Sequence, residues 1–169
     1  MPHIIIDGYN LIRQSFRWGM LDAQDMRAGR EALLEDLAAY KKKKAFRITV
    51  VFDGAKAPGF FPKNDRIHGI TVTFSHAGES ADDVIKRMAE TLREGALVVS
   101  SDRDVASFAS RQGAGVIGSV EFERRVLGGS IDSGAEESDS GWAVTTKKKG
   151  PGRRLPKRER RTLSHLKKL

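Results

Sequence analysis

Three short apolar segments, each leading into an aspartate, constrain the fold of this chain more than any other feature. They end at Asp7, Asp53 and Asp102. Apolar runs of this kind are typical of strands that are buried on both faces of a parallel sheet. Since helices fit between them, successive strands should be parallel with right-handed crossovers. The three carboxylates are then expected at one edge of the sheet, where open α/β sheets bind ligands.

Helical patterns fill the intervals between these strands. From about residue 25 to residue 44, apolar side chains recur at spacings of three and four, and four lysines close the segment. Ser80 is a good N-cap for a second helix that ends at Gly95, and Asp83 takes the acidic position of a capping box. Ser119 is expected to cap the last helix of the body. The two remaining helices are predicted at residues 104–112 and 119–127.

The other segments of the body lack a helical pattern. Residues 10–23 are expected to form a loop with a short helical turn, and residues 54–67, rich in Gly and Pro, an irregular loop. Residues 67–74 alternate as in a half-exposed edge strand, and residues 114–117 form a last short strand. We therefore predict one α/β domain over residues 1–127, with a mostly parallel central sheet flanked by helices.

The excess positive charge lies after this domain. Residues 1–146 carry 19 Lys and Arg against 21 Asp and Glu, a net charge of −2, whereas residues 147–169 carry 11 against one, a net charge of +10. Together they give the net charge of +8 for the whole chain. Residues 128–146, rich in Gly, Ser and acids, are predicted to be a flexible linker. Residues 147–169 are then a basic tail that could contain a short helix.

Such a tail indicates a polyanionic partner, RNA rather than a membrane, because it lacks the aromatic residues of an interfacial helix. A merely solubilising extension is the alternative. Candidate RNA contacts in the tail are Lys147, Lys148, Lys149, Arg153 and Arg154. The loop at 54–67 adds Lys56, Lys63 and Arg66, together with Phe60 and Phe61, which could stack a base or pack onto the body.

Acids also stand where the predicted helices begin. With those at the strand ends, they form a set of seven: Asp7, Asp53, Asp102, Glu79, Asp82, Asp83 and Asp104. Helix capping explains some of them, but so many carboxylates on one rim repel one another unless cations neutralise them. Oxygen ligands without His or Cys favour Mg²⁺ or Mn²⁺ over zinc, and such ions suit phosphodiester hydrolysis. Asn10 could orient a water molecule or a phosphate.

Other chemistries find less support. The chain has no cysteine, which excludes disulfides and thiol nucleophiles. It also has no Ser/His/Asp order, no GxxxxGK[ST] and no GxGxxG motif. A phospho-acceptor receiver domain would carry an acidic pair at its first strand and a lysine after its last, and neither is present. Without a long apolar run or a signal-like N-terminus, we expect a soluble cytoplasmic protein.

Four sequence blocks carry a resemblance to a known family. They are Ile5-Ile6-Asp7-Gly8-Tyr9-Asn10, Val51-Phe52-Asp53-Gly54, Gly78-Glu79-Ser80-Ala81-Asp82-Asp83 and Val99-Ser100-Ser101-Asp102. In this order they resemble the NYN domain of the YacP-like group, within the PIN-like nuclease superfamily. The resemblance spans roughly residues 3 to 127 and leaves the linker and the tail outside.

The resemblance implies a three-layer PIN-like fold and a metal-dependent endoribonuclease that cuts single-stranded RNA. It also suggests an association with the translating ribosome. Carried onto this chain, it implies Asp7, Asp82 and Asp102 as metal-binding acids, with Asp83 as a fourth, and Asn10 as the matching asparagine. Asp53 matches a recurrent acid, whereas Glu79 and Asp104 remain candidates. The competing hypothesis is a non-catalytic adaptor that binds RNA or the ribosome through its basic tail.

Overall fold

The computed structural model describes residues 2–44, 46–56, 64–128 and 157–167. Its strands form one sheet in the order β3-β4-β2-β1-β5-β6. The strands are β1 (His3–Asp7), β2 (Arg47–Phe52), β3 (Asn64–Ile67), β4 (Ile70–Phe74), β5 (Ala96–Val99) and β6 (Gly115–Ile117). Every neighbouring pair is parallel except β3 and β4, which are antiparallel. This mixed, mostly parallel sheet confirms the predicted fold class.

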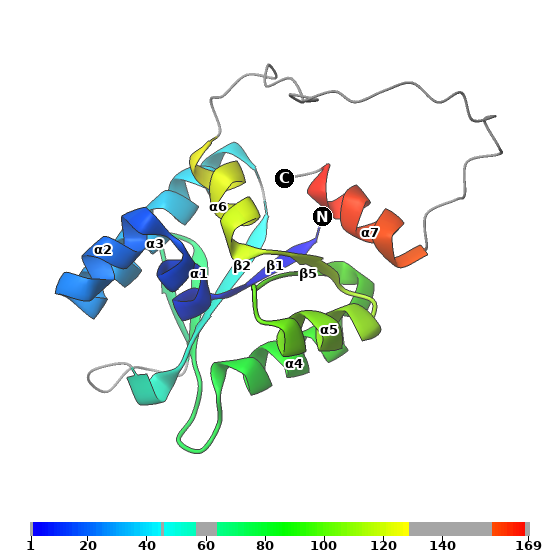
Figure 1. The fold of residues 1–169 in the computed structure, drawn as a ribbon, viewed down its shortest axis with the longest axis horizontal. Helices are drawn as coiled ribbons and strands as arrows, with labels where there is room; N and C mark the ends of the chain where they lie inside the picture. The colour runs from blue at the N-terminus through cyan, green and yellow to red at the C-terminus, as the bar shows by residue number, and fades with distance from the viewer. Residues whose placement is uncertain (1, 45, 57–63, 129–156, 168–169) are drawn as a thin grey trace, which may run out of the picture.

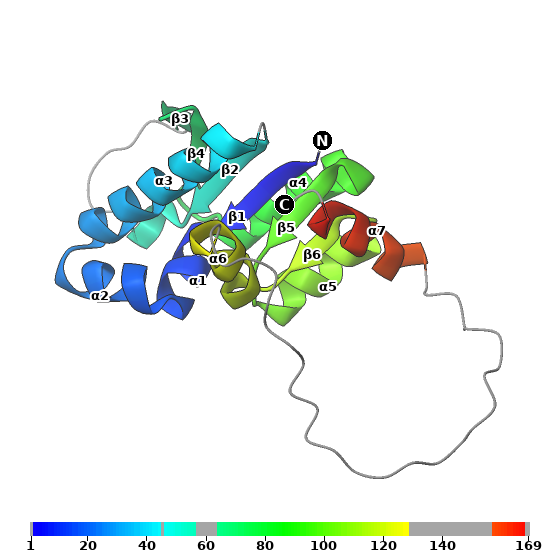
Figure 2. The same cartoon turned by 90° about the horizontal axis from the view of Figure 1, so that it is seen from above.

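Helices cover both faces of the sheet (Figures 1 and 2). They are α1 (Gly8–Gln14), α2 (Phe16–Gln24), α3 (Met26–Lys43), α4 (Ala81–Leu92), α5 (Arg103–Arg111), α6 (Ser119–Leu127) and α7 (Lys157–Leu166), with 3₁₀ turns η1 (Gly54–Lys56) and η2 (Arg93–Gly95). Helices α1, α2, α3 and α6 share one hydrophobic core, and α4 and α5 share the other. The chain therefore has three layers.

Alternation along the central strands divides these two cores. Ile4 and Ile6 of β1 belong to the core beneath α1, α3 and α6, whereas Ile5 between them belongs to the core beneath α4 and α5. All three are fully buried. Successive side chains of a strand point to opposite faces, so an unbroken apolar run serves both cores. This explains why the central strands read as continuous apolar segments in the sequence.

The prediction of a loop over residues 10–23 was wrong. Two helices occupy this region, and each has a side-chain N-cap: Asp7 accepts a hydrogen bond from the backbone of Asn10, and Ser15 accepts one from the backbone of Trp18. Trp18 is fully buried and donates its ring N–H to Asp36 over 2.8 Å. Helices of one or two turns give too few repeats for a period to be visible, and here capping and packing hold them.

The structure also corrects the edge of the sheet. Residues 64–67, expected to be irregular, form β3, which pairs with β4 and takes the edge position that had been predicted for residues 67–74. Strand β4 keeps the predicted alternation of buried and half-buried side chains. The predicted contacts Phe60, Phe61 and Lys63 lie outside the described residues.

The C-terminal part is described only over α7. This helix begins directly after Pro156, as the prediction of a short basic helix requires, and it packs beside β6 (Figure 2). The linker after Gly128 and the predicted contacts at 147–154 lie outside the described residues. Within the part of the chain that is described, no helix combines the length and the apolar character needed to cross a membrane.

Candidate active site

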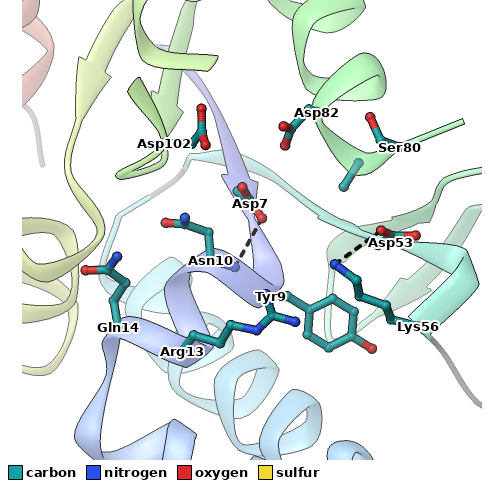
Figure 3. A pocket seen from close by; sticks show the side chains of 11 residues that line it. Asp7, Tyr9, Asn10, Arg13, Gln14, Asp53, Lys56, Ser80, Asp82 and Asp102 are labelled. Atoms are coloured by element: carbon teal, nitrogen blue, oxygen red, sulfur yellow. Dashed lines mark hydrogen bonds and ion pairs between the residues drawn. The ribbon is translucent and has the colours of Figure 1, made fainter. Parts of the chain in front are cut away.

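A pocket of about 390 Å³ opens at the carboxyl ends of the central strands. Figure 3 shows Asp7 between two groups of side chains: Asp82 and Asp102 on one side, and Arg13 and Lys56 on the other. The pocket is lined by Asp7, Tyr9, Asn10, Arg13, Gln14, Asp53, Lys56, Ser80, Ala81, Asp82 and Asp102. The structure thus brings together four of the seven predicted acids and the predicted asparagine.

Asp7 lies deepest among these acids. It is the last residue of β1 and also the N-cap of α1, and only 7% of its surface is exposed. Burial raises the pKa of Asp7 to about 6, and the negative charges of Asp82 and Asp102 add to that increase. Hydrogen bonds from the backbone N–H of Asn10 and from the Ser100 hydroxyl, over 3.2 and 3.4 Å, lower the pKa of Asp7 in opposition to these effects. Asp7 is therefore a buried carboxyl group whose charged form has no cationic partner among the described residues.

Asp82 and Asp102 come from the beginnings of α4 and α5. Burial raises the pKa of Asp82, and the charge of Asp102 contributes to the increase. Asp102 is the N-cap of α5, where one of its oxygens accepts hydrogen bonds from the backbones of Asp104 and Val105 over 2.8 and 3.1 Å. These bonds hold one oxygen of Asp102 in the helix start. Three acids from three elements thus meet across 95 residues of sequence.

The side chain of Asn10 ties the loops around this pocket together. Its carbonyl oxygen accepts hydrogen bonds from the backbone N–H of Ser101 over 3.0 Å and from the hydroxyl of Ser119 over 2.8 Å. The Ser101 hydroxyl in turn accepts a hydrogen bond from the backbone of Ser119 over 3.0 Å. Asn10 therefore joins α1 to the loop after β5 and to the start of α6. The side-chain oxygen is thus engaged within the protein, and the prediction that Asn10 orients water or a phosphate stays a prediction.

Ser119 differs from its prediction as a helix cap. The N-cap of α6 is Gly118, which has no side-chain capping bond, and Ser119 is the first residue of the helix. Its side chain is fully buried, because it is turned toward Asn10. The sequence pattern of a serine before an apolar helix cannot distinguish these two positions. Ser100 and Ser101 were likewise absent from the predicted site, although they stand directly before Asp102.

Three of the predicted acids engage partners elsewhere. Glu79 pairs with Arg87, Asp83 forms a capping box with Ser80, and Asp104 pairs with Lys86. Each interaction lowers the pKa of the acid concerned, through the hydrogen bond from Arg87, Ser80 or Lys86 respectively. None of the three acids lines the pocket. The structure therefore separates the four acids that line the pocket from three that are engaged by partners outside it.

Asp53 and Lys56 form the far wall of the pocket. They make an ion pair of 3.6 Å, and Asp53 also accepts a hydrogen bond from the backbone of Ala55 over 3.0 Å. Lys56, a predicted RNA contact, thus lines the pocket. Arg66, another predicted contact, is exposed on the edge strand β3 and does not line it.

Arg13, Gln14 and Tyr9 line the pocket without having been predicted. They belong to α1, and Arg13 and Gln14 follow Asn10 by three and four residues, the spacing that places side chains on one helix face. The Tyr9 hydroxyl accepts a hydrogen bond from Arg30 over 2.9 Å, and its ring meets that of Phe52 edge-on at 5.1 Å. Predicting a helix from residue 8 would have placed these side chains beside Asn10, but residues 8–14 show no helical periodicity in the sequence.

The donor set suits a divalent cation by its chemistry. Asp7, Asp82 and Asp102 make no ion pair with any described residue, and the charge of Asp102 raises the pKa of both Asp7 and Asp82, so a cation would relieve their repulsion. As placed, however, no three His, Asp or Glu side chains of the described residues form a group that could hold a metal ion. Coordination would therefore require these carboxylates to turn closer together.

Comparisons with known proteins show the family to which the chain belongs. The family model of the YacP-like NYN domain matches residues 4–168, so the match runs beyond the resemblance seen at residues 3–127 and includes α7. The curated relative YacP of Bacillus subtilis (strain 168), described as uncharacterized, is 30% identical over 92 residues, or 54% of each chain. The chain thus spans about half the length of that relative.

Solved structures give the same relationship. A crystal structure of Rae1 (YacP) from Bacillus subtilis matches with a TM-score of 0.64 and 30% identity, covering 76% of this chain and 75% of that one. A variant of the same protein matches with a TM-score of 0.63 and 26% identity, covering 76% of both chains. The predicted resemblance is confirmed: this chain belongs to the YacP-like NYN domain family, a nuclease-type family of the PIN-like superfamily.

Proposed function

We propose that this protein is an endoribonuclease that uses Mg²⁺ or Mn²⁺ to hydrolyse phosphodiester bonds of single-stranded RNA. The observation that carries the proposal is the pocket at the strand ends, which Asp7, Asp82 and Asp102 line together and where burial and neighbouring carboxylates raise the pKa of Asp7 and of Asp82. A carboxylate cluster of this kind is suited to hard divalent cations. Membership of a nuclease-type family supports the same chemistry.

Each side of the pocket has its own task in this proposal. A bound divalent cation supplies Lewis acidity and lowers the pKa of a water molecule. Asp7, Asp82 and Asp102 supply the oxygen ligands, and Asn10 holds the loops that carry Asp7 and Asp102 in register. Arg13 and Lys56, on the opposite side of Asp7, are placed to face the phosphate backbone (Figure 3). In this proposal the metal and the scissile bond lie beside Asp82 and Asp102, and the RNA backbone binds on the other side of Asp7, at Arg13 and Lys56.

Cleavage with and without metal tests this proposal. Purified full-length protein should cut a circular single-stranded RNA in Mg²⁺ or Mn²⁺, which only an endonuclease can do, and should stop in EDTA. Asp7→Asn should lose the activity while remaining folded, and Asp65→Asn, an exposed acid on β3, should keep it. Undiminished cleavage by Asp7→Asn would refute the site, and cleavage of linear but not circular RNA would refute endonucleolytic action.

The basic tail supports a second proposal, an RNA- or ribosome-binding adaptor without catalysis. Its net charge of +10 over residues 147–169 is the observation that favours it. Removal of these residues should then abolish RNA binding and flatten its dependence on salt. Association with the ribosome itself rests on the family resemblance, and cosedimentation of the full chain with purified ribosomes tests it. Equal binding by full-length and truncated protein would argue against the adaptor.

A further inference from the structure

A second hollow adjoins the candidate active site along α1 and α2. It has a volume of about 630 Å³ and shares Arg13 and Gln14 with the acidic pocket, so the two hollows lie side by side. Phe16 and Met20 of α2 also line it. These side chains are 84% and 52% exposed, and Phe16 is the most exposed large hydrophobic residue of the described chain. The exposed ring of Phe16 thus lies in a hollow next to the acidic pocket.

The fold of this region does not require Phe16 for its core. Ser15 separates α1 from α2 and caps α2, which makes Phe16 the first residue of that helix. The neighbouring aromatic residue, Trp18, is fully buried and fixed to Asp36. Packing of α2 is therefore accomplished by Trp18, whereas Phe16 presents its ring to solvent beside the pocket. Burial of that ring by a ligand would gain free energy that folding has not used.

Charge marks the junction between the two hollows. Arg13 lines both and makes no ion pair with any described residue, whereas Lys56 across the pocket is already paired with Asp53. The second hollow also contains one acid, Asp22, so its charge is balanced overall. A ligand there would be held by its contact with the ring, and an anionic group would be held at Arg13.

An extended single-stranded nucleic acid has this combination of groups. Its phosphates bind cations and its bases stack on aromatic side chains, independently of sequence. We propose that single-stranded RNA leaves the candidate active site past Arg13, with a backbone phosphate at its guanidinium, and that the adjoining base stacks on Phe16. The substrate class rests on the proposed function, whereas the path follows from the shared lining of the two hollows.

Substitution of Phe16 tests the stacking contact. In EDTA, which prevents cleavage, full-length protein binds a fluorescently labelled single-stranded RNA. Phe16→Ala should bind roughly 5- to 150-fold more weakly, the range that loss of one stacked base predicts. Phe16→Trp should bind as tightly as the wild type, and Phe16→Leu should bind as weakly as the alanine variant. Leu127→Ala, an exposed apolar residue at the end of α6, is the control and should have no effect.

Tryptophan fluorescence reports on the same position directly. RNA should quench the emission of Phe16→Trp beyond any quenching seen with the wild type, whatever the basic tail contributes to affinity. Absence of extra quenching when RNA is bound would overturn the proposal. Wild-type affinity of Phe16→Leu would also overturn it, because an apolar contact would then suffice. Loss of self-association in Phe16→Ala, with RNA binding unchanged, would reassign the surface to a protein partner.

Substitution of Arg13 tests the phosphate contact. Loss of one phosphate contact should reduce the slope of log affinity against log salt concentration by about 0.7, the value for single strands. Arg13→Ala should show this reduction, and Arg47→Ala, an exposed arginine at the start of β2 and so at the opposite end of the strands from the pocket, should not. Equal slopes for wild type and Arg13→Ala would overturn this part of the path.

The two proposals can fail separately. If Phe16 and Arg13 govern RNA binding but no RNA is cut in Mg²⁺ or Mn²⁺, the path stands and the nuclease assignment fails. If RNA is cut in a manner that requires Asp7, but binding and cleavage are indifferent to Phe16 and Arg13, the nuclease stands and the path fails.

Discussion

Asp7 lies in surroundings that disfavour its charged form. Burial and two neighbouring carboxylates raise its pKa from 3.8 to about 6, against the hydrogen bond from Asn10. Between these two pH values the folded chain holds a proton that the unfolded chain has released. The contribution of Asp7 to stability therefore decreases as the pH rises from about 4 through 6. The proposed metal site should show this dependence on pH in the absence of divalent cations.

Neutralisation of Asp7 should accordingly stabilise the fold. In the absence of divalent cations at pH 7.5, Asp7→Asn should raise the free energy of unfolding by roughly 2–3 kcal/mol, because about two pKa units correspond to that energy. Below pH 4 the gain should vanish, since the wild-type carboxyl group is then protonated as well. Urea denaturation at pH 3.5, 5.5 and 7.5 measures the difference. A gain that does not vary with pH would contradict the explanation.

At the level of elements, the first turn of α4 separates two adjacent acids. Successive residues of a helix point about 100° apart, so Asp82 faces the pocket while Asp83 folds back onto Ser80. Their pKa values move in opposite directions: burial raises that of Asp82, and hydrogen bonds from Ser80 lower that of Asp83. The same residue type thus lines the pocket at one position and caps the helix at the next.

Alanine substitution should distinguish these two acids. Asp83→Ala should lower the stability of the protein, because it removes the capping box, and should leave RNA cleavage within a few-fold of the wild type. Asp82→Ala should abolish cleavage without lowering stability, because it relieves repulsion with Asp102. Thermal unfolding and single-turnover cleavage rates measure the two effects. If Asp83→Ala lost cleavage and Asp82→Ala kept it, Asp83 rather than Asp82 would be the metal ligand, and this prediction would be wrong.

The contact between α1 and the loops around the site depends on Asn10. Asn10→Ala removes the acceptor of the Ser101 and Ser119 hydrogen bonds, and Ser119 is fully buried. We expect a loss of roughly 1–3 kcal/mol in the free energy of unfolding, the cost of a buried polar group left without its partner. Gln14→Ala, on the same helix face but exposed, is the matched control. Chemical denaturation at pH 7 measures the stability of both variants. Equal stability would contradict a stabilising role for the hydrogen bonds of Asn10 with Ser101 and Ser119.

For the whole molecule, the two edges of the sheet differ in how they are covered. Strand β3 forms one edge, and β6 forms the other, beside which α7 packs. A Cβ atom at Gly115 would lie 2.7 Å from Nδ1 of His165, so the absence of a side chain on β6 permits this approach. Covering an edge strand prevents it from pairing with another chain. Helix α7, within the basic tail, thus packs onto the body.

Gly115→Ala should loosen this packing. The added Cβ forces His165 to move, and α7 should then be cut faster by trypsin, which recognises its lysines and arginines. Gly95→Ala is the control, because a Cβ there meets no atom within 4 Å. Mass spectrometry of the fragments would show whether cleavage within residues 157–167 accelerates in the first variant only. Equal rates in the two variants would contradict the close approach.

Prediction from the sequence succeeded where the determining forces are local. The apolar strands, the long helix α3 and the Ser80–Asp83 capping box follow from run length, periodicity and cap residues within a few positions. It failed for α1, α2 and β3, which are short and depend on partners distant in sequence. Because α1 and α2 were not predicted, the sequence offered no reason to place Arg13 or Phe16 beside the acidic pocket.

By itself, the sequence determined the alternation of strands and helices and the presence of seven acids near one edge. Only the tertiary structure decided which of them share a pocket, because that depends on which cation or backbone group lies within reach of each side chain. Asp7, Asp82 and Asp102 are left facing one another, whereas Glu79, Asp83 and Asp104 find partners on α4 or at its start. Such neighbours are set by strand order and helix packing, which no local pattern contains.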